Sequence, residues 1–287
     1  MMSQYMEIKS NYSEALLFYR MGDFYELFFE DAKVAARALD IALTKRGKHD
    51  DEDIPMCGVP HHSAENYIFS LINQGFRVAI CEQMESPEEA KKRGYKAVVK
   101  REVVRLVTPG TLTEDNLLDA RKNNYLAAFS VVHNEASISW VDISTGSFHI
   151  SSIKPDKLSS ELTRLSPSEI LLSENLVEEH RDLAEEFGIS VTELGNSAFD
   201  SSSARERLKK TFKVETVDGL GTFNRAEISA MGAIIEYLQI TQKGKLPLLS
   251  RPQRELNSSF MSIDTATRKN LELTKGLSSG NKSGSLL

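Results

Sequence analysis

The stretch that decides the fold of the first part of the chain is Arg20-Met21-Gly22-Asp23-Phe24-Tyr25-Glu26-Leu27-Phe28. The apolar run before it, residues 15–19, has the length and the β-rich composition of a buried strand. Gly22-Asp23 breaks this run, and the residues that follow predict a helix over 24–39. The sequence thus predicts a strand, a break and a helix in succession.

Two acidic residues favour a capped start for this helix. Asp23 is a good N-cap residue, and Glu26 follows three residues later, as in a capping box. Phe24 would lie in the first helical turn, on the face of Phe28, and this spacing predicts a core position for its ring. The alternative is a surface position, where Phe24 and Glu26 together contact a ligand.

Length, composition and charge limit the classes of protein. A chain of 287 residues with 40% apolar and 26% charged residues is sufficient for two globular domains, with a third possible. The net charge is −6, distributed as −2 over residues 1–109, −7 over 110–245 and +3 over 246–287. This distribution argues against generic electrostatic binding of nucleic acid. Without a signal pattern or a membrane-spanning apolar run, we expect a cytoplasmic protein.

The usual chemical signatures are absent from the sequence. It contains no phosphate-binding glycine loop and no nucleophile elbow. Cys57 and Cys81, with His61 and His62, suggest a zinc site, but no paired metal-ligand spacing supports one. We therefore expect two buried thiols and a polar turn, and no metal, cofactor or catalytic residue in this chain.

The rest of the first part reads as a mixed α/β domain. Its expected elements are a strand over 41–46, a rigid Pro/Gly-punctuated segment over 54–62, a helix over 64–74 with Ser63 as N-cap, a strand over 76–81, a charged loop or helix over 85–95 and a strand over 98–107. Thr108-Pro109-Gly110-Thr111 ends the last strand, and we place the first domain boundary there.

A new pattern begins at Asn123. Three β-rich runs with short breaks predict an antiparallel meander, and helices and strands then alternate. The runs are 125–133, 136–143 and 146–153; the helices are 156–165, 176–187, 203–212 and 225–241; the later strands are 169–172 and 189–194. This order resembles the ribonuclease-H-like arrangement, a mixed sheet with helices on both faces.

Such a sheet raises the possibility of a nuclease, which needs clustered carboxylates to hold two metal ions. The first strand of the meander contains no acid. Asp142, beside Ser144-Thr145-Gly146, is better interpreted as a residue that caps a turn. We therefore expect no nuclease activity.

Several long motifs resemble those of MutS-type DNA mismatch-recognition proteins. They are the stretch 20–28, Leu43-Thr44-Lys45-Arg46-Gly47, Ile54-Pro55-Met56-Cys57-Gly58-Val59-Pro60, Ala79-Ile80-Cys81-Glu82-Gln83, Arg105-Leu106-Val107-Thr108-Pro109-Gly110-Thr111, Val141-Asp142-Ile143-Ser144-Thr145-Gly146, and Asp264-Thr265-Ala266-Thr267-Arg268-Lys269-Asn270-Leu271-Glu272-Leu273. The resemblance covers nearly the whole chain. The sequence departs from the family pattern at His61-His62 and in a longer region around 88–95.

The resemblance implies three parts and a site. These parts are a mismatch-recognition domain over 1–109, a ribonuclease-H-like connector domain over 110–245, and the start of a helical lever domain over 246–287. Phe24 would stack on the mispaired base and Glu26 would hydrogen-bond to it. The expected neighbours of the pair are Met21, Asp23 and Tyr25, with Arg46 as a contact to the DNA backbone.

The resemblance also implies partners. The ligand would be double-stranded DNA with mismatches or small loops, and downstream mismatch-repair proteins would bind as well. In the family, segments that are missing from this sequence form the homodimer and use Mg-ATP, so we expect no enzyme activity and no cofactor here. The alternative hypothesis is that residues 110–245 act as a protein-interaction or signal-relay module without direct reading of DNA.

Overall fold

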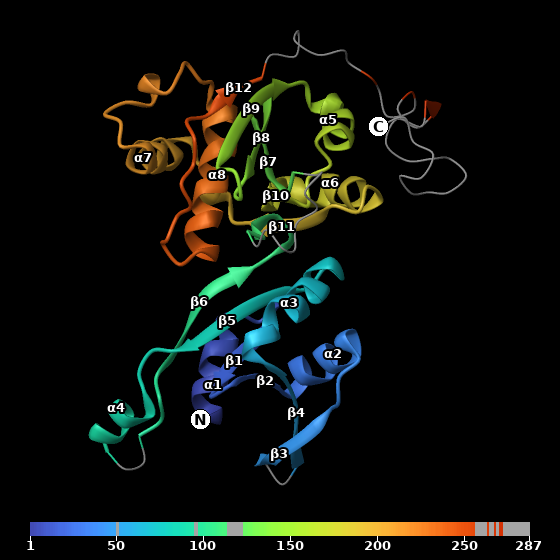
Figure 1. Ribbon diagram of the computed structural model, residues 1–287. Coiled ribbons are helices and arrows are strands. Elements are labelled where there is room, and N and C mark those ends of the chain that lie inside the picture. Colours follow the sequence, from blue (N-terminus) through green and yellow to red (C-terminus); the bar gives the residue numbers. More distant parts are fainter. Residues whose placement is uncertain are drawn as a thin grey trace. The chain divides into compact units, whose positions relative to one another are not determined.

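The computed structural model describes residues 1–49, 52–94, 97–113 and 123–255, with the isolated positions 263, 267, 270 and 271. The chain divides into two compact units, Met1–Lys122 with Leu238–Pro247, and Asn123–Tyr237 with Leu248–Leu287. Within the described residues each unit holds a six-stranded mixed sheet with helices (Figure 1). The predicted α/β class is confirmed. The boundaries at 110 and 246 stay predictions, and most of the predicted lever segment lies outside the described residues.

The first sheet has the strand order β3-β4-β2-β1-β5-β6. Strands β1 and β5 run parallel, and the other neighbours are antiparallel. The strands are β1 (Ala15–Met21), β2 (Phe24–Phe28), β3 (Thr44–His49), β4 (Glu52–Pro60), β5 (Arg77–Gln83) and β6 (Arg101–Val107). Strand β2 therefore lies inside the sheet, between β4 and β1.

Helices cover both faces of this sheet (Figure 1). Helices α2 (Phe29–Leu39) and α3 (Ala64–Asn73) pack on one face, where the core includes Phe18, Leu27 and Val78. Helix α1 (Met2–Ser10) covers part of the other face, and its Tyr5 ring lies 5.1 Å from the ring of Phe28. A shorter helix, α4 (Pro87–Lys92), follows β5 and begins with a capping box. The first sheet therefore has a hydrophobic core on each of its two faces.

The prediction of a helix over 24–39 is wrong for its first five residues. Residues 24–28 form β2, and Gly22-Asp23 is a two-residue hairpin turn in which Met21 opposes Phe24. Gly22 has a φ of +60°, and Asp23 is not among the residues with positive φ, which is the pattern of a type II′ turn. The burial alternates with a period of two, since Tyr25 and Leu27 are buried and Phe24 is exposed. Asp23 therefore belongs to a hairpin and does not cap a helix.

Helix α2 begins five residues later, directly after the strand. Phe28 is still extended and makes no side-chain cap, while Phe29 has a φ of +56°, so the chain turns from strand to helix without a loop. Asp31, in the first turn of α2, accepts hydrogen bonds from the Leu17 backbone N–H at 2.9 Å and from Tyr5 Oη at 3.4 Å. It also forms an ion pair with Lys9 at 2.8 Å. This carboxylate joins α1, β1 and α2.

Two other predictions for the first unit need correction. The rigid Pro/Gly-punctuated segment expected over 54–62 is mostly strand β4. Pro55 and Pro60 lie at positions of this strand where the sheet tolerates proline. The strand expected over 41–46 begins later, at Thr44. Ser63 does precede α3, but its hydroxyl donates to the Pro60 carbonyl oxygen rather than capping the helix.

The second unit follows the predicted order of elements. Its strands are β7 (Tyr125–Val132), β8 (Glu135–Asp142), β9 (Ser147–Ile153), β10 (Glu169–Ser173), β11 (Ser190–Leu194) and β12 (Gln253–Arg254), and its helices are α5 (Leu158–Leu165), α6 (Glu174–Glu186), α7 (Ser201–Phe212) and α8 (Arg225–Thr241). Strands β7, β8 and β9 form the predicted antiparallel meander, and β10 and β11 add parallel strands beside β7. The mixed sheet expected of a ribonuclease-H-like arrangement is therefore present.

Side chains from the two faces of this sheet contact different helices. Phe129, Ile138 and Trp140 share a core with α5 and α6. On the other face, buried Ser130 donates to Ser229 of α8 at 2.8 Å. No helix among the described residues is long and apolar enough to cross a membrane.

Asp142 has the turn-capping role that the sequence predicts. Its Oδ1 accepts hydrogen bonds from the backbone N–H and the hydroxyl of Ser144, at 2.9 and 2.6 Å. The turn ends at Gly146, whose carbonyl oxygen accepts from the Ser250 N–H at 2.7 Å. A Cβ atom on Gly146 would lie 2.3 Å from the carbonyl oxygen of Leu248. The segment around 248–250 therefore packs against this turn because residue 146 has no side chain.

Replacing Gly146 with Ala tests this packing. Gly188 is a matched control for backbone strain, because its φ is +71° against +73° for Gly146, and a Cβ atom added there would meet no other part of the chain within 4 Å. We expect Gly188→Ala to lower the free energy of unfolding by about 1 kcal/mol and Gly146→Ala by about 1–3 kcal/mol more. Urea unfolding measures both values, and equal losses would contradict the packing role.

The predicted buried thiols are confirmed. Cys57 and Cys81 are free and buried, and they belong to the cores on opposite faces of the first sheet. Burial raises the pKa of the Cys57 thiol to about 11, with Asp31 adding to the effect, and raises the pKa of Cys81 to about 12. Two thiols on opposite faces of a sheet cannot bind one metal ion.

These pKa values predict slow thiol chemistry. Relative to a thiol of pKa 9.0, the thiolate fraction at pH 8 is lower by about a hundredfold for Cys57 and a thousandfold for Cys81. A thiol reagent should therefore modify the folded chain at least a hundredfold more slowly than the urea-unfolded chain, with the rate rising as pH increases. A Cys57→Ala variant identifies which thiol reacts. Rapid modification of either cysteine in the folded chain would contradict the burial.

Candidate nucleic-acid interface

The candidate site is the end of the hairpin formed by β1 and β2. Because side chains alternate along a strand, Phe24 and Glu26 lie on the face that holds Tyr19 and Phe28, whereas Tyr25 and Leu27 lie on the opposite face. Helix α1 packs over the Phe28 end of this face. Phe24 is four residues, about 13 Å, further along the strand, and it is 47% exposed. The core position predicted from helical spacing is therefore wrong, because residues 24–28 form a strand, and Phe24 has the surface position given above as the alternative.

Glu26 lies beside Phe24 on the same face and forms an ion pair with Arg46. The Arg46 Nη1 atom donates to Glu26 Oε2. The Glu26 side chain is 14% exposed, while the Arg46 side chain is 41% exposed. Within the described part of the chain, no other hydrogen bond reaches the Glu26 carboxylate. Sequence motifs predicted both residues for the site, and the structure brings them together with Phe24.

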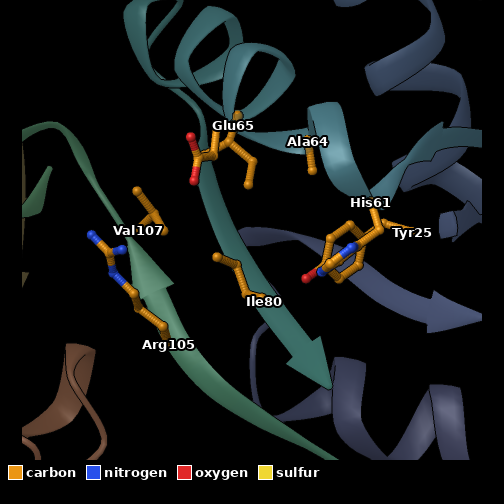
Figure 2. A pocket seen from close by; sticks show the side chains of 8 residues that line it. Tyr25, His61, Ala64, Glu65, Ile80, Arg105 and Val107 are labelled. Atoms are coloured by element: carbon orange, nitrogen blue, oxygen red, sulfur yellow. The ribbon is translucent and has the colours of Figure 1, made fainter. Parts of the chain in front are cut away.

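Tyr25, another predicted site residue, faces the other way. Its hydroxyl donates to Glu82 Oε1, and burial raises its pKa above the usual range, with Glu82 adding to the shift. Its ring lines a cavity of about 200 Å³. Figure 2 shows Tyr25 and His61 at one end of this cavity, Arg105 at the other and Ile80 between them. The cavity and the Phe24 ring are therefore on opposite faces of the sheet.

Met21 and Asp23 flank the turn. Asp23 is exposed, and its backbone carbonyl accepts from the His61 N–H at 2.8 Å, which ties the turn to the segment after β4. Met21 is half-buried, and its sulfur atom accepts from Arg101 Nη2 at 3.2 Å. Both predicted residues therefore lie next to Phe24, one at the turn and one across the hairpin.

Arg101 is a supporting residue that the sequence did not single out. It is 8% exposed, its Nε donates to the Arg20 carbonyl oxygen at 2.7 Å, and its guanidinium carbon lies 4.8 Å from the centre of the Tyr19 ring. These contacts hold the end of β1 against the start of β6. The only sequence signal was a strand with interleaved basic residues, which does not distinguish a buried arginine from exposed ones.

The zinc site, which the sequence already disfavours, has no set of ligands among the described residues. His61 and His62 lie in a short 3₁₀ turn, His61–Ser63, and the His61 ring packs 5.5 Å from the ring of Tyr25. Among the residues that the structure describes, no three His, Cys, Asp or Glu side chains gather in a way that could hold a metal ion. The polar-turn interpretation of this segment therefore agrees with the contacts of His61.

The site is thus a projecting surface. It offers an exposed aromatic ring for stacking, a carboxylate acceptor beside it and a guanidinium that balances the carboxylate charge. Small molecules usually bind in concave pockets. A projecting ring on a rigid hairpin fits a large ligand with flat groups that can stack, such as a nucleic acid.

Comparison with known proteins identifies the family. Residues 1–116 match the family described as MutS domain I, and residues 124–250 match MutS domain II. The chain is 63% identical over its whole length to DNA mismatch repair protein MutS of Roseobacter denitrificans, and 61% identical to that of a Ruegeria species. It spans 33% of the length of each of these relatives. The chain belongs to the MutS family and carries its domains I and II.

Proposed function

We propose that this chain recognises mismatched or unpaired bases in duplex DNA, with Phe24 and Glu26 as the reading residues. The observation that carries the proposal is the exposure of the Phe24 ring at the end of a strand whose other residues are held in the sheet. Similarity to DNA mismatch repair proteins supports the class of ligand. Phe24 stacks on the displaced base, and Glu26 makes a hydrogen bond to that base.

The strand that carries Phe24 is held firmly in the sheet, which suits insertion of the ring into a base stack. Strand β2 has neighbours on both sides, and the buried Tyr25 and Leu27 anchor it from the opposite face. An apolar side chain that enters a base step kinks the duplex and costs about a few kcal/mol of unstacking. A rigid ring loses little conformational entropy of its own, so more of the stacking energy remains for binding.

Discrimination follows from the cost of deforming DNA. A mismatched or unpaired base is already poorly stacked, so less energy is needed to open its step than to open a paired one. Base–aromatic stacking contributes about 1–3 kcal/mol. The same ring therefore gains net energy at a defect and loses it at a paired step, without reading the surrounding sequence.

Glu26 adds a contact that only a displaced base provides. An ionised carboxylate accepts hydrogen bonds from base N–H groups and is repelled by phosphates. At a paired step the Watson–Crick edges are engaged with each other, so the N–H groups of those edges become available to the carboxylate only when a base is displaced. Glu26 therefore contributes to preference for defects rather than to overall affinity.

The chain lacks much of the length over which the relatives carry their other functions. It covers about a third of their length. We infer that Mg-ATP use and homodimer formation reside in those other parts, and that this chain has no catalytic role itself. Downstream mismatch-repair proteins in the bacterial cytosol are the proposed protein partners.

The test is Phe24→Ala, placed in a protein of the relatives' full length. We expect the ratio of affinities for mismatched and paired duplexes to approach one, a loss of about 5- to 150-fold, because stacking worth about 1–3 kcal/mol is removed. Affinity for paired DNA should change by less than about threefold. Fluorescence anisotropy with two duplexes that differ only at one base pair measures the ratio at fixed salt.

Two variants control this experiment. Phe24→Tyr retains the ring and should retain the preference. Leu43→Ala removes an apolar side chain of similar exposure, 49%, from the same unit and should leave the ratio unchanged. A preference that survives Phe24→Ala would overturn the proposal and would favour the alternative in which residues 110–245 relay signals without reading DNA.

A further inference from the structure

The contact between Arg46 and Glu26 crosses a strand. Arg46 belongs to the edge strand β3, Glu26 belongs to β2, and β4 lies between them. Neighbouring strands are about 4.8 Å apart, so the two backbones are separated by roughly 10 Å. An arginine side chain is long enough to span this distance, but only if it is aimed along the sheet and nothing blocks its path.

A β-bulge aims the Arg46 side chain. In the pairing of β3 with β4, Lys45 opposes Pro55 and Lys48 opposes Asp53, so Arg46 and Gly47 together oppose one residue, Ile54. Gly47 has a φ of +69°, which an L side chain adopts only with strain. Bulges redirect side chains and are found next to functional sites. Because of the bulge, the Arg46 side chain does not follow the regular alternation of side chains along the edge strand.

A glycine on the intervening strand leaves the path open. Gly58 of β4 pairs with Glu26, and a Cβ atom there would lie 3.7 Å from Glu26 Cγ and 3.4 Å from the Tyr25 carbonyl oxygen. Its backbone is not in the left-handed region, so conformation alone does not require glycine. A larger side chain would contact Glu26 from the side that Arg46 approaches.

The pair engages only half of the carboxylate. Arg46 donates to Oε2, and within the described residues nothing donates to Oε1. Glu26 is mostly covered, at 14% side-chain exposure, so without its cation it would be a poorly solvated charge. Arg46 therefore balances the charge and restricts the orientation of the side chain, while one oxygen atom stays available.

We propose that Arg46 determines specificity by positioning Glu26. The guanidinium holds Oε2 and orients Glu26 beside Phe24 so that Oε1 meets the displaced base. This inference rests on the proposed function and departs from the expectation that Arg46 contacts the DNA backbone. A backbone contact strengthens binding to every duplex, whereas a positioning contact acts only on the preference for defects, and only through Glu26.

A double-mutant cycle separates these roles in the protein of full length. Arg46→Ala should lower the ratio of mismatched to paired affinity by about tenfold, in the range of coupled contacts. In the Glu26→Ala background the same substitution should leave the ratio unchanged, because there is no carboxylate to position. Arg46→Lys should restore part of the ratio, since an ammonium keeps the charge but lacks the planar donor geometry.

Lys45→Ala is the matched control for loss of charge. Lys45 precedes Arg46 in the same strand, its side chain is 72% exposed, and its ion pair is with Asp53 rather than with the site. Its loss should leave the ratio unchanged. Thermal unfolding should shift by less than about 2 °C for Lys45→Ala, because its pair is exposed. Arg46→Ala leaves the covered Glu26 carboxylate without its cation, so its unfolding midpoint should fall further, and a single cooperative transition shows that its fold is retained.

Four results would overturn the inference. One is an equal loss of affinity for both duplexes, with the slope of log affinity against log salt reduced by about one, which indicates a phosphate contact. Another is an effect of Arg46→Ala on the ratio that persists in the Glu26→Ala background. If the unsubstituted protein shows no preference for the defect, the proposed function fails as well. If Phe24→Ala and Glu26→Ala lower the ratio but Arg46→Ala does not, the proposed function stands and this inference fails.

Discussion

The two-residue turn at Gly22-Asp23 sets the register of β1 against β2, and this register decides which side chains reach each face of the first sheet. A shift by one residue would exchange the faces of the strand, so that Phe24 entered the core and Tyr25 faced solvent. Gly22 makes the turn possible because its positive φ matches the twist of the paired strands. The position of the exposed ring is therefore a consequence of backbone geometry at a neighbouring glycine.

Polar contacts elsewhere in the first unit stabilise the register of β1 against β2. Asp31 joins α1, β1 and α2 through one carboxylate, and Arg101 holds the end of β1 through the Arg20 carbonyl and the sulfur atom of Met21. These buried polar contacts are directional, so they resist sliding of the strands in a way that apolar packing alone does not. The proposed insertion of Phe24 into a base stack requires such a rigid support, because a mobile hairpin would move before the DNA opened.

Local sequence predicted the second unit better than the start of the first. The meander over 125–153 and helix 225–241 follow their own periodicities, and tertiary packing agrees with them. At residues 23–26 the sequence satisfies the local rule for a helix cap, but pairing of β2 with both β1 and β4 uses the same residues as a strand. The structure places Met21, Asp23, Tyr25 and Glu26 on the hairpin that carries Phe24, but the motifs gave no sign that Tyr25 faces the opposite side of the sheet. The pair of Glu26 with Arg46 could not be predicted, because it depends on strand order and on a bulge at Gly47.

The ion pair between Glu26 and Arg46 is important because the chain as a whole is acidic. A lone carboxylate beside Phe24 would repel the phosphates of any duplex that approached, and the net charge of −6 offers no general attraction to offset it. Pairing with Arg46 makes the local charge close to neutral while one carboxylate oxygen stays open. In the proposed function, this face can then approach DNA closely without strong binding to every sequence. Weak general attraction is an advantage for a reader of rare defects, because paired sites vastly outnumber mismatched ones and compete for the same surface.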